Sequence, residues 1–191
     1  MPEIATLESL EQLMVRQRAV RTFTDQPVDD ALVERLIDAA TRAPSAKNVQ
    51  LLRFIVVRDR ALKQQISRLF EQSSEVVPGG PTPWEEVPVL IFVVSDDPFG
   101  ASPTGALALA GSVYPGIQNL LLAAQAAGLG SVLTTSRGKL KEPEIKKMLN
   151  LPDDFQIHAV LPIGYPAVKL GKNKCKPVGE VAFRDRFGEA W

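Results

Sequence analysis

Apolar residues recur at helical spacing in several parts of the chain. Within residues 7–14, three leucines and a methionine recur at helical spacing, which predicts an amphipathic helix. A second helix is predicted to begin at Asp29 or Asp30, whose carboxylate can accept from the free N–H groups of a first turn, and to end before Pro44. Three more helices are predicted over residues 60–70, 111–127 and 139–149.

The 111–127 segment differs from the other predicted helices because it is apolar nearly all round. A helix of this kind must be covered by more than one neighbour. Burial inside a single domain and burial in a dimer interface explain the pattern equally well. Gly128 follows the last residue and is the expected C-terminal cap of this helix.

Shorter apolar runs predict strands. Residues 89–94 are apolar without a break, which favours a strand buried on both faces. Further strands are predicted over residues 54–57, 131–135 and 157–163. Between the first two strands, residues 76–88 are rich in proline and glycine and predict a long irregular loop. Trp84 in this loop either closes over a substrate pocket or plugs the loop itself.

Composition narrows the class of protein. A chain of 191 residues predicts one domain, and 22 basic residues balance 22 acidic ones, so no overall field favours nucleic acid or an anionic membrane. One cysteine excludes an internal disulfide, and one histidine argues against a His/Cys metal site; we expect His158 to be a satisfied core or edge histidine. The N-terminus lacks the basic region and apolar core of a secretory signal, and no run approaches the length of a membrane span. A cytoplasmic protein is expected.

Candidate ligand-binding groups lie in two places near the N-terminus and one near the C-terminus. Arg16, Arg18 and Arg21 follow the first predicted helix; each could simply complement its carboxyl end, but three cations within six residues favour a ligand site. The polar loop 45–50 runs into a strand, where sites are commonly built, although such residues are often simple turn formers. The lysines of residues 169–176 are either a solvated basic stretch or a phosphate clamp.

The last fourteen residues, 178–191, carry large apolar side chains such as Phe187 and Trp191, so we expect them to dock on another surface. Sequence motifs of dinucleotide-binding folds and phosphate loops are missing, and one histidine supports no Ser/His/Asp assembly. If the chain is an enzyme, a cofactor must carry the chemistry.

Several short motifs occur in a fixed order along the chain. They are RAVRTF at 18–23, PV at 27–28, APSAKNVQ at 43–50, QNLLLAA at 118–124, GLG at 128–130 and GYP at 164–166. In order and spacing they resemble the FMN-dependent nitroreductase family, over nearly the whole chain. The ending, residues 180–188, resembles a bacterial branch of that family.

The resemblance implies an α+β fold with a mixed central β-sheet flanked by helices, assembled as an intertwined homodimer with FMN at the subunit interface. Residues 1–191 would then form a single FMN-binding domain, with 178–191 as a C-terminal extension that packs on the partner subunit. The apolar helix of residues 111–127 would pack against its partner.

The resemblance also implies a cofactor site. Cations of the arginine-rich motif would contact the phosphate and ribityl chain of FMN, and Arg21 would reach the pyrimidine edge of the ring, where a cation stabilises the charge of the reduced flavin. Pro44, Ser45 and Asn48 would line the ring, and a backbone N–H near Thr135 would point at N5. The implied cofactor-binding residues are Gln17, Arg18, Ala19, Arg21, Pro44, Ser45, Asn48, Leu133, Thr134, Thr135, Lys174 and Lys176.

This sequence departs from the family pattern at some of these positions. Gln17 and Ala19 stand where an arginine and a serine are common, so part of the phosphate clamp is weakened or supplied elsewhere. Leu51 and Leu52 replace a frequent Pro-Trp pair. Lysines near Cys175 replace an arginine-rich stretch, and lysine lacks the two-pronged geometry of arginine.

The activity implied is that of an FMN-dependent NAD(P)H oxidoreductase with ping-pong kinetics. NADH or NADPH passes a hydride to flavin N5 and leaves, and a nitroaromatic, a quinone or a similar conjugated acceptor takes its place. The hydride step requires no protein acid or base, so we expect no catalytic side chain and no metal. Two alternatives remain: a same-fold enzyme with another acceptor, selected by the 76–88 loop, and a flavin-binding or interaction protein without turnover.

Overall fold

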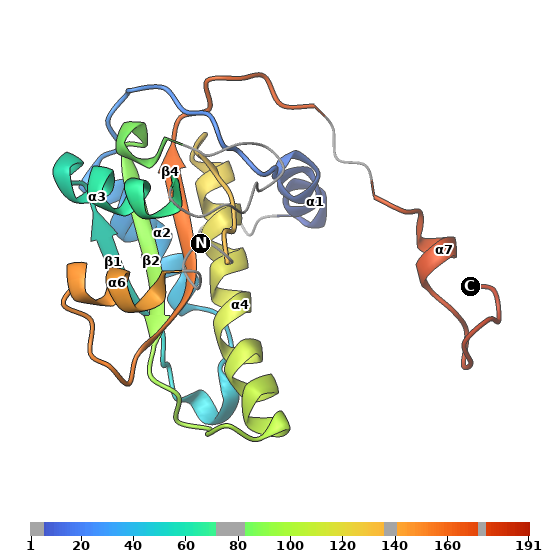
Figure 1. Cartoon of the computed structure of the whole chain (residues 1–191). Coiled ribbons are helices and arrows are strands. Elements are labelled where there is room, and N and C mark those ends of the chain that lie inside the picture. Colours follow the sequence, from blue (N-terminus) through green and yellow to red (C-terminus); the bar gives the residue numbers. More distant parts are fainter. Residues whose placement is uncertain (1–5, 72–82, 136–140, 172–174) are drawn as a thin grey trace, which may run out of the picture.

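A four-stranded sheet lies at the centre of the fold (Figure 1). The structure is a computed structural model that describes residues 6–71, 83–135, 141–171 and 175–191. The strands run in the order β1-β2-β4-β3, each pair antiparallel, and an isolated parallel bridge joins Ala19 to Ser131 at the β3 edge. They are β1 (Arg53–Val57), β2 (Val89–Ser95), β3 (Gly130–Ser131) and β4 (Gln156–Gly164). The expected α+β class is confirmed.

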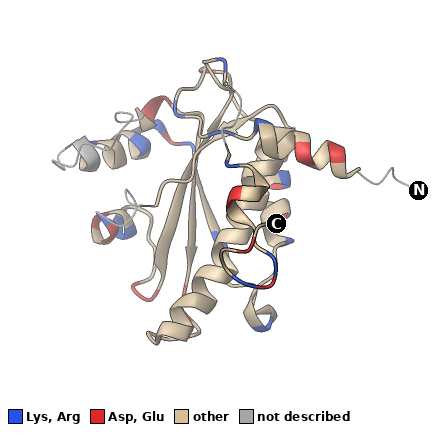
Figure 2. Cartoon of the chain, turned by 90° about the vertical axis from the view of Figure 1, so that its right-hand side faces the viewer, with Lys and Arg blue, Asp and Glu red and all other residues tan. Residues whose placement is uncertain are grey.

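Helices cover both faces of the sheet, as Figure 2 shows from the side. The helices of the described chain are α1 (Leu7–Arg16), α2 (Asp30–Thr41), α3 (Arg60–Glu71), α4 (Pro103–Ala126), α6 (Glu142–Met148) and α7 (Val178–Val181), of which α7 lies away from the sheet; there are also two short 3-10 turns, η1 (Ala46–Asn48) and η2 (Trp84–Glu86). Asp29 caps α2 by accepting from the Ala31 N–H at 3.3 Å, as the sequence predicts.

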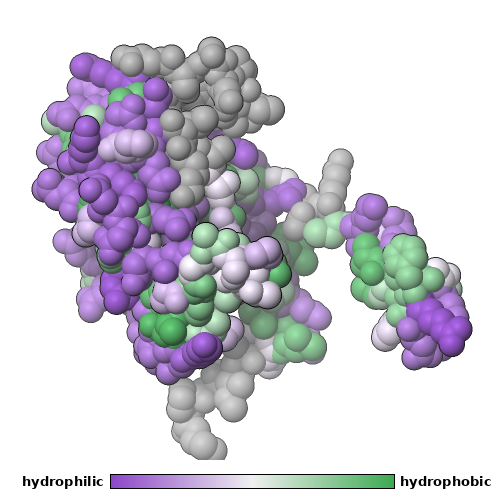
Figure 3. All heavy atoms as spheres, turned by 60° about the horizontal axis from the view of Figure 1, so that its bottom comes forward, coloured by the Kyte–Doolittle hydropathy of each residue, from purple (hydrophilic) through white to green (hydrophobic). Residues whose placement is uncertain are grey.

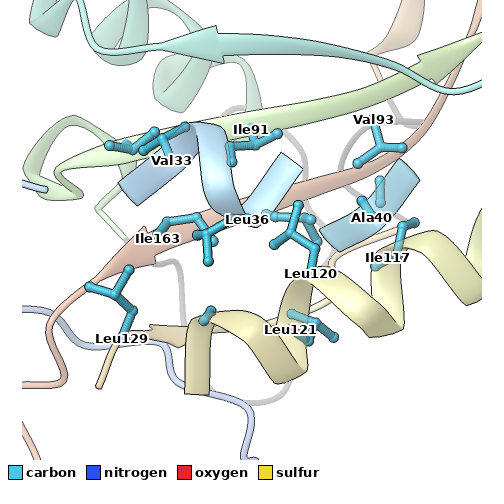
Figure 4. Packing of buried hydrophobic residues seen from close by; sticks show 14 of the residues in the cluster. Val33, Leu36, Ala40, Ile91, Val93, Ile117, Leu120, Leu121, Leu129 and Ile163 are labelled. Carbon is cyan, nitrogen blue, oxygen red and sulfur yellow. The ribbon is translucent and has the colours of Figure 1, made fainter. Parts of the chain in front are cut away.

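The core forms two layers because strand side chains alternate between faces. Every residue of β2 is buried, which confirms the prediction for this strand. Its Ile91 and Val93 pack with α2 and α4, as Figure 4 shows in close-up. Leu90 and Phe92 point the other way and pack with α3, η2 and α6.

Helix α4 is longer than the sequence pattern indicates. It begins at Pro103 rather than Gly111 because Ser102 caps it, accepting from the Gly105 N–H at 3.0 Å, and proline suits the first turn of a helix. Its predicted end is confirmed by Gly128, whose φ of 73° is the left-handed geometry of a C-terminal cap.

Helix α4 carries no charged residue (Figure 2). Among the described residues it is the one helix long and apolar enough to cross a membrane, by length and composition only, so the expectation that no run approaches this length is wrong for α4. About a third of its most apolar window is buried within the chain, and Leu107, with 74% of its surface exposed, and Tyr114 lie on the open face. One chain therefore leaves part of an apolar helix uncovered.

Two predicted elements have different bounds. The strand predicted over 131–135 is only Gly130–Ser131, followed by an isolated bridge between Thr134 and Val160. The helix predicted over 139–149 is α6, Glu142–Met148; residues 136–140 lie outside the described part of the chain.

The C-terminal residues 175–191 form an arm that projects away from the sheet and its helices (Figure 1). Phe187 is 92% exposed and Trp191 67%. The arm has contacts of its own: the Phe183 and Phe187 rings lie 4.5 Å apart, and Arg184 lies over the Trp191 ring. The apolar surface predicted to dock elsewhere is thus exposed in one chain, and it is visible in green in Figure 3.

Candidate functional site

The arginine segment, residues 17–24, is fixed by backbone hydrogen bonds on two sides. On one side, the Val20 N–H donates to the Ser131 carbonyl at 2.9 Å. On the other side, the Thr24 N–H donates to the Tyr165 carbonyl at 2.8 Å, and the Thr22 carbonyl accepts from Ala167 at 3.0 Å. Val20 is 1% exposed and anchors the segment to the core. The backbone of this segment is therefore held independently of its charged side chains.

The side chains of this segment have different surroundings. Gln17 is the C-terminal cap of α1 and is half-buried. Arg18 is half-buried, and its Nε donates to the Gly171 carbonyl at 3.0 Å. Ala19 and Arg21 are exposed. Arg18 thus ties the segment to residues 165–171, which lead toward the predicted phosphate-binding lysines.

Of those lysines, Lys174 lies outside the described residues. Lys176 is exposed and stands at the start of the projecting arm (Figure 1). Within one chain, the arm therefore carries Lys176 away from the sheet.

The predicted ring-facing turn, Leu133–Thr135, is a neighbour of the arginine segment. Thr134 exchanges two backbone hydrogen bonds with Val160, at 3.3 and 2.8 Å, and Leu133 is 40% exposed. Ser131, which bonds the arginine segment, precedes this turn by two residues. The structure therefore brings together two of the sets that the sequence predicts: 17–21 and 133–135.

The loop of residues 44–50 has an uncommon backbone. Lys47, Asn48 and Gln50 have φ of 54°, 56° and 48°, a left-handed geometry that costs about 1–3 kcal/mol at a residue other than glycine. Pro44 and Asn48 are exposed and Ser45 is half-buried. Such strain is concentrated at functional sites, which favours the ligand-site interpretation of this loop over that of an ordinary turn.

This loop is attached to α4, whereas the arginine segment is attached to β3, beyond the end of that helix (Figure 1). The loop bonds to α4 through Ser112, since the Ala46 N–H donates to its Oγ at 2.9 Å. The arginine segment bonds to Ser131, just beyond the end of α4 at Ala126. At 1.5 Å per residue, the part of the helix between Ser112 and Ala126 is about 21 Å long. One chain therefore does not bring all the predicted residues together.

Two other candidates have structural explanations. Trp84 is 1% exposed and packs in the core layer with Ile66 and Phe92, so it is a plug and does not close over a pocket; residues 76–82 of its loop lie outside the described chain. His158 is buried and its Nε2 lies 2.8 Å from Ser95 Oγ. The same Ser95 hydroxyl lies 2.7 Å from the Asp96 carbonyl, so serine and histidine belong to one hydrogen-bonded chain, in which the tautomer of His158 sets the donor. The prediction of a satisfied histidine is confirmed.

Two cavities among the described residues lie away from the predicted site. One cavity of about 630 Å³ lies along α6, and another of about 400 Å³ lies between α2 and α4. Neither is lined by a predicted site residue. No cluster of three or more histidine, cysteine, aspartate or glutamate side chains that could hold a metal occurs within the described ranges.

Three positioning contacts were missed at the sequence level. Ser112 of α4 accepts from the Ala46 N–H, and Asn119 of α4 donates to the Ala39 carbonyl. Arg53 donates to the Gln50 carbonyl at 2.9 Å. A serine or an asparagine in an apolar helix gives no sign of which loop it faces. Likewise, an arginine at the first position of a strand does not indicate which carbonyl its side chain will bond.

The order of the strands and the helical layers, together with the neighbouring sets 17–21 and 133–135, define a nitroreductase-like α+β fold. The sequence pattern of the nitroreductase family matches residues 14–165, and the chain belongs to this family.

Individual relatives agree with this assignment. The chain is 32% identical to a Methanothermobacter thermautotrophicus protein named NADH dehydrogenase/NAD(P)H nitroreductase, over 88% of this chain and 83% of the relative. It is 31% identical to an iodotyrosine deiodinase of Thermotoga neapolitana, over 84% and 90% of the two chains. The solved structure of an iodotyrosine deiodinase bound to FMN and 3-iodo-L-tyrosine superposes with a TM-score of 0.77 at 27% identity, over 93% of this chain and all of that one.

Proposed function

We propose that this protein is an FMN-dependent NAD(P)H oxidoreductase of the cytoplasm that reduces a nitroaromatic, a quinone or a similar conjugated acceptor. One observation carries the proposal: the arginine segment is fastened by its backbone to Ser131, beside the exposed Leu133–Thr135 turn. Family membership and the NAD(P)H- and FMN-related names of the relatives support it.

The donor set fits FMN in its chemistry. A phosphate requires cations and N–H donors, and the exposed guanidinium of Arg21 and that of Arg18 supply charge, although Gln17 and Ala19 add none. A flat polar ring requires amide and backbone groups beside apolar surface, and Asn48, Ser45 and Leu133 supply these. When bound, FMN supplies a ring that accepts a hydride from NAD(P)H and donates it to an acceptor. The protein groups bind FMN, orient its ring and tune its reduction potential; none acts as an acid or base.

The active form is proposed to be a homodimer. About 21 Å of α4 lies between the attachment of the 44–50 loop at Ser112 and the end of the helix, beyond which the arginine segment is attached. A second copy can therefore complete the site by placing its own loop near this chain's arginines. Exposed apolar residues would form the interface. They include Leu7, Leu10, Met14 and Val15 of α1, Leu107 and Tyr114 of α4, and Val178, Val181, Phe187 and Trp191 of the arm.

The visible spectrum of the purified protein, with FMN added where needed, tests the proposal. We expect a bound flavin band that bleaches on anaerobic addition of NADH or NADPH and returns when a quinone or nitroaromatic is added. Sedimentation should give twice the chain mass. A protein that binds no FMN, or binds FMN that no pyridine nucleotide reduces, contradicts the oxidoreductase proposal; the second result favours a flavin-binding protein without turnover.

A second candidate, reductive removal of halogen from an aromatic amino acid, is favoured by the deiodinase relatives. Release of iodide from 3-iodo-L-tyrosine by the chemically reduced protein distinguishes it. If iodide is released faster than quinone is reduced, the second candidate replaces the first acceptor class.

A further inference from the structure

The 44–50 loop needs external support because its own backbone is strained. Three of its residues have left-handed φ, a conformation that L-residues avoid unless surrounding contacts impose it. Within the loop, the Ser45 carbonyl accepts from Asn48 at 2.9 Å, and Ser45 Oγ accepts from Gln50 at 3.1 Å. These bonds close the turn but do not fix its place on the protein.

Ser112 fixes that place. It is 2% exposed on α4, and its Oγ accepts from the Ala46 N–H at 2.9 Å while its hydroxyl proton is donated to the Ala108 carbonyl at 2.7 Å. Both roles of the hydroxyl are thus filled, and the direction of each bond is set by its partner. Without the hydroxyl, the Ala46 N–H would lose its acceptor at a part-buried position.

The same face of α4 holds the chain on either side of the loop. Gly116, one turn beyond Ser112, has no room for a side chain: a Cβ there would lie 2.5 Å from Leu52 Cδ1 and 3.0 Å from the Ala40 carbonyl oxygen. Asn119 Nδ2 donates to the Ala39 carbonyl at 3.2 Å. Residues four and seven positions apart share one helix face. Ser112, Gly116 and Asn119 therefore form one stripe along which the end of α2, the loop and the start of β1 are seated.

We propose that Ser112 is a positioning residue that holds the 44–50 loop in its left-handed conformation and thereby sets where the loop meets the bound cofactor. This inference rests on the proposed function for the identity of the cofactor. The hold on the loop itself is a property of the chain alone.

Two variants break the contact from opposite sides. Ser112→Ala removes the acceptor. Ala46→Pro removes the donor, and Ser45, with φ of −131° and ψ of 147°, already has the extended geometry that a following proline requires. Ser102→Ala is the matched control, because it makes the same chemical change on α4 at a cap that does not touch the loop.

The first readout is amide hydrogen exchange of the protein without added FMN. We expect the Gln50 amide to exchange about tenfold faster in both test variants, the Ala46 amide to do so in Ser112→Ala, and neither to change in Ser102→Ala. Because both variants remove one contact, the double variant should exchange no faster than either single one. Thermal unfolding of each variant shows whether it is folded. If Ser112→Ala does not fold, Ala46→Pro alone tests the contact.

The second readout is FMN itself. We expect a dissociation constant about tenfold higher in both test variants than in Ser102→Ala, and an altered visible circular dichroism band at saturating FMN, which a merely less stable protein would not show. Gln50 exchange and FMN affinity equal to those of Ser102→Ala would overturn the inference. If the wild-type chain binds no FMN, the proposed function fails, and exchange alone then decides whether Ser112 holds the loop.

Discussion

The arginine segment and the 44–50 loop carry the two halves of the candidate site, and they are held in different ways. The arginine segment has backbone hydrogen bonds on two sides and a buried anchor, Val20. The loop has left-handed residues, and side chains make the contacts that hold it: Ser45 closes the turn from within, and Ser112 and Arg53 tie it to α4 and to the start of β1. The first half should therefore tolerate changes to its polar side chains without moving, whereas the second should move when one hydroxyl is lost.

The comparison predicts where each half is vulnerable. A segment fixed through its backbone is displaced only by changing what it packs against. A strained loop relaxes as soon as one of its supports is removed, because the left-handed residues gain by relaxing. The predictions below test this contrast, from the largest expected effect to the smallest.

Gly130→Ala should displace the arginine segment. A Cβ at Gly130 would lie 2.6–2.7 Å from three atoms of the Val20 side chain, and overpacking of this kind costs about 1–3 kcal/mol. Urea unfolding should show the loss of stability, and FMN affinity should fall with it. The wild-type protein is the reference: an unfolding midpoint of Gly130→Ala equal to that of the wild type would show that Val20 is not an anchor.

Arg21→Ala should separate binding from stability. Arg21 is exposed, so its loss should change the free energy of unfolding by less than about 0.5 kcal/mol. If its guanidinium bonds to FMN, the dissociation constant should rise about tenfold or more, since a hydrogen bond to a charged group contributes about 1.5–3 kcal/mol. Arg60→Ala, at the exposed start of α3, is the control. Equal FMN affinity and equal flavin potential in both variants would remove Arg21 from the site.

Ser45→Ala should loosen the loop from within. The variant loses the acceptor of the Gln50 N–H, which costs about 0.5–1.5 kcal/mol, and exchange of the Gln50 amide should quicken accordingly. Ser9→Ala on α1 loses a bond of similar kind, from Ser9 Oγ to the Thr6 carbonyl, without touching the site. Equal Gln50 exchange in the two variants would mean that Ser45 is not a support of the loop.

Sequence reasoning picks out both halves of the candidate site, but it predicts the backbone conformation of only one of them. The arginine segment is predictable because cations after a helix, an apolar Val20 and an extended stretch are all visible in the order of residues. The loop is visible as a polar stretch after Pro44, yet its left-handed backbone is imposed by tertiary contacts. No local rule assigns positive φ to Lys47 or Gln50.

The bounds of α4 show the same limit at a helix end. The predicted helix begins at Gly111, although Ser102 before Pro103 is the pattern of a cap and a first helical position. Whether this pattern starts a helix depends on what the following turn packs against. Trp84 is similar: an aromatic residue in a proline-rich loop can plug or cover, and only the packing with Ile66 decides.

A third region gives a change in stability that should leave both halves of the site untouched. Lys63 of α3 is 5% exposed in the opposite layer of the core, and its Nζ donates to the Val87 carbonyl. Burial, with a smaller contribution from the charges of Arg60 and Arg58, lowers the pKa of Lys63 below its ordinary value of 10.5. The folded chain therefore releases this proton at a lower pH than the unfolded chain does.

Between the lowered pKa of Lys63 in the folded chain and about 10.5, the unfolded chain binds more protons than the folded chain does. The free energy of unfolding should therefore rise with pH over this range. Urea unfolding across this range should show the rise in the wild-type protein and a smaller one in Lys63→Met, with Lys147→Met on the surface of α6 as control. Gln50 and Val20 amide exchange through local opening should differ little between Lys63→Met and wild type, because these amides donate to Ser45 and Ser131, whereas the Lys63 amine donates to Val87. If the Gln50 amide exchanges more slowly as Lys63 loses its proton, exchange at this amide requires unfolding of the whole protein. The effects of Ser45 and Ser112 on that exchange would then report global stability and not a local hold on the loop.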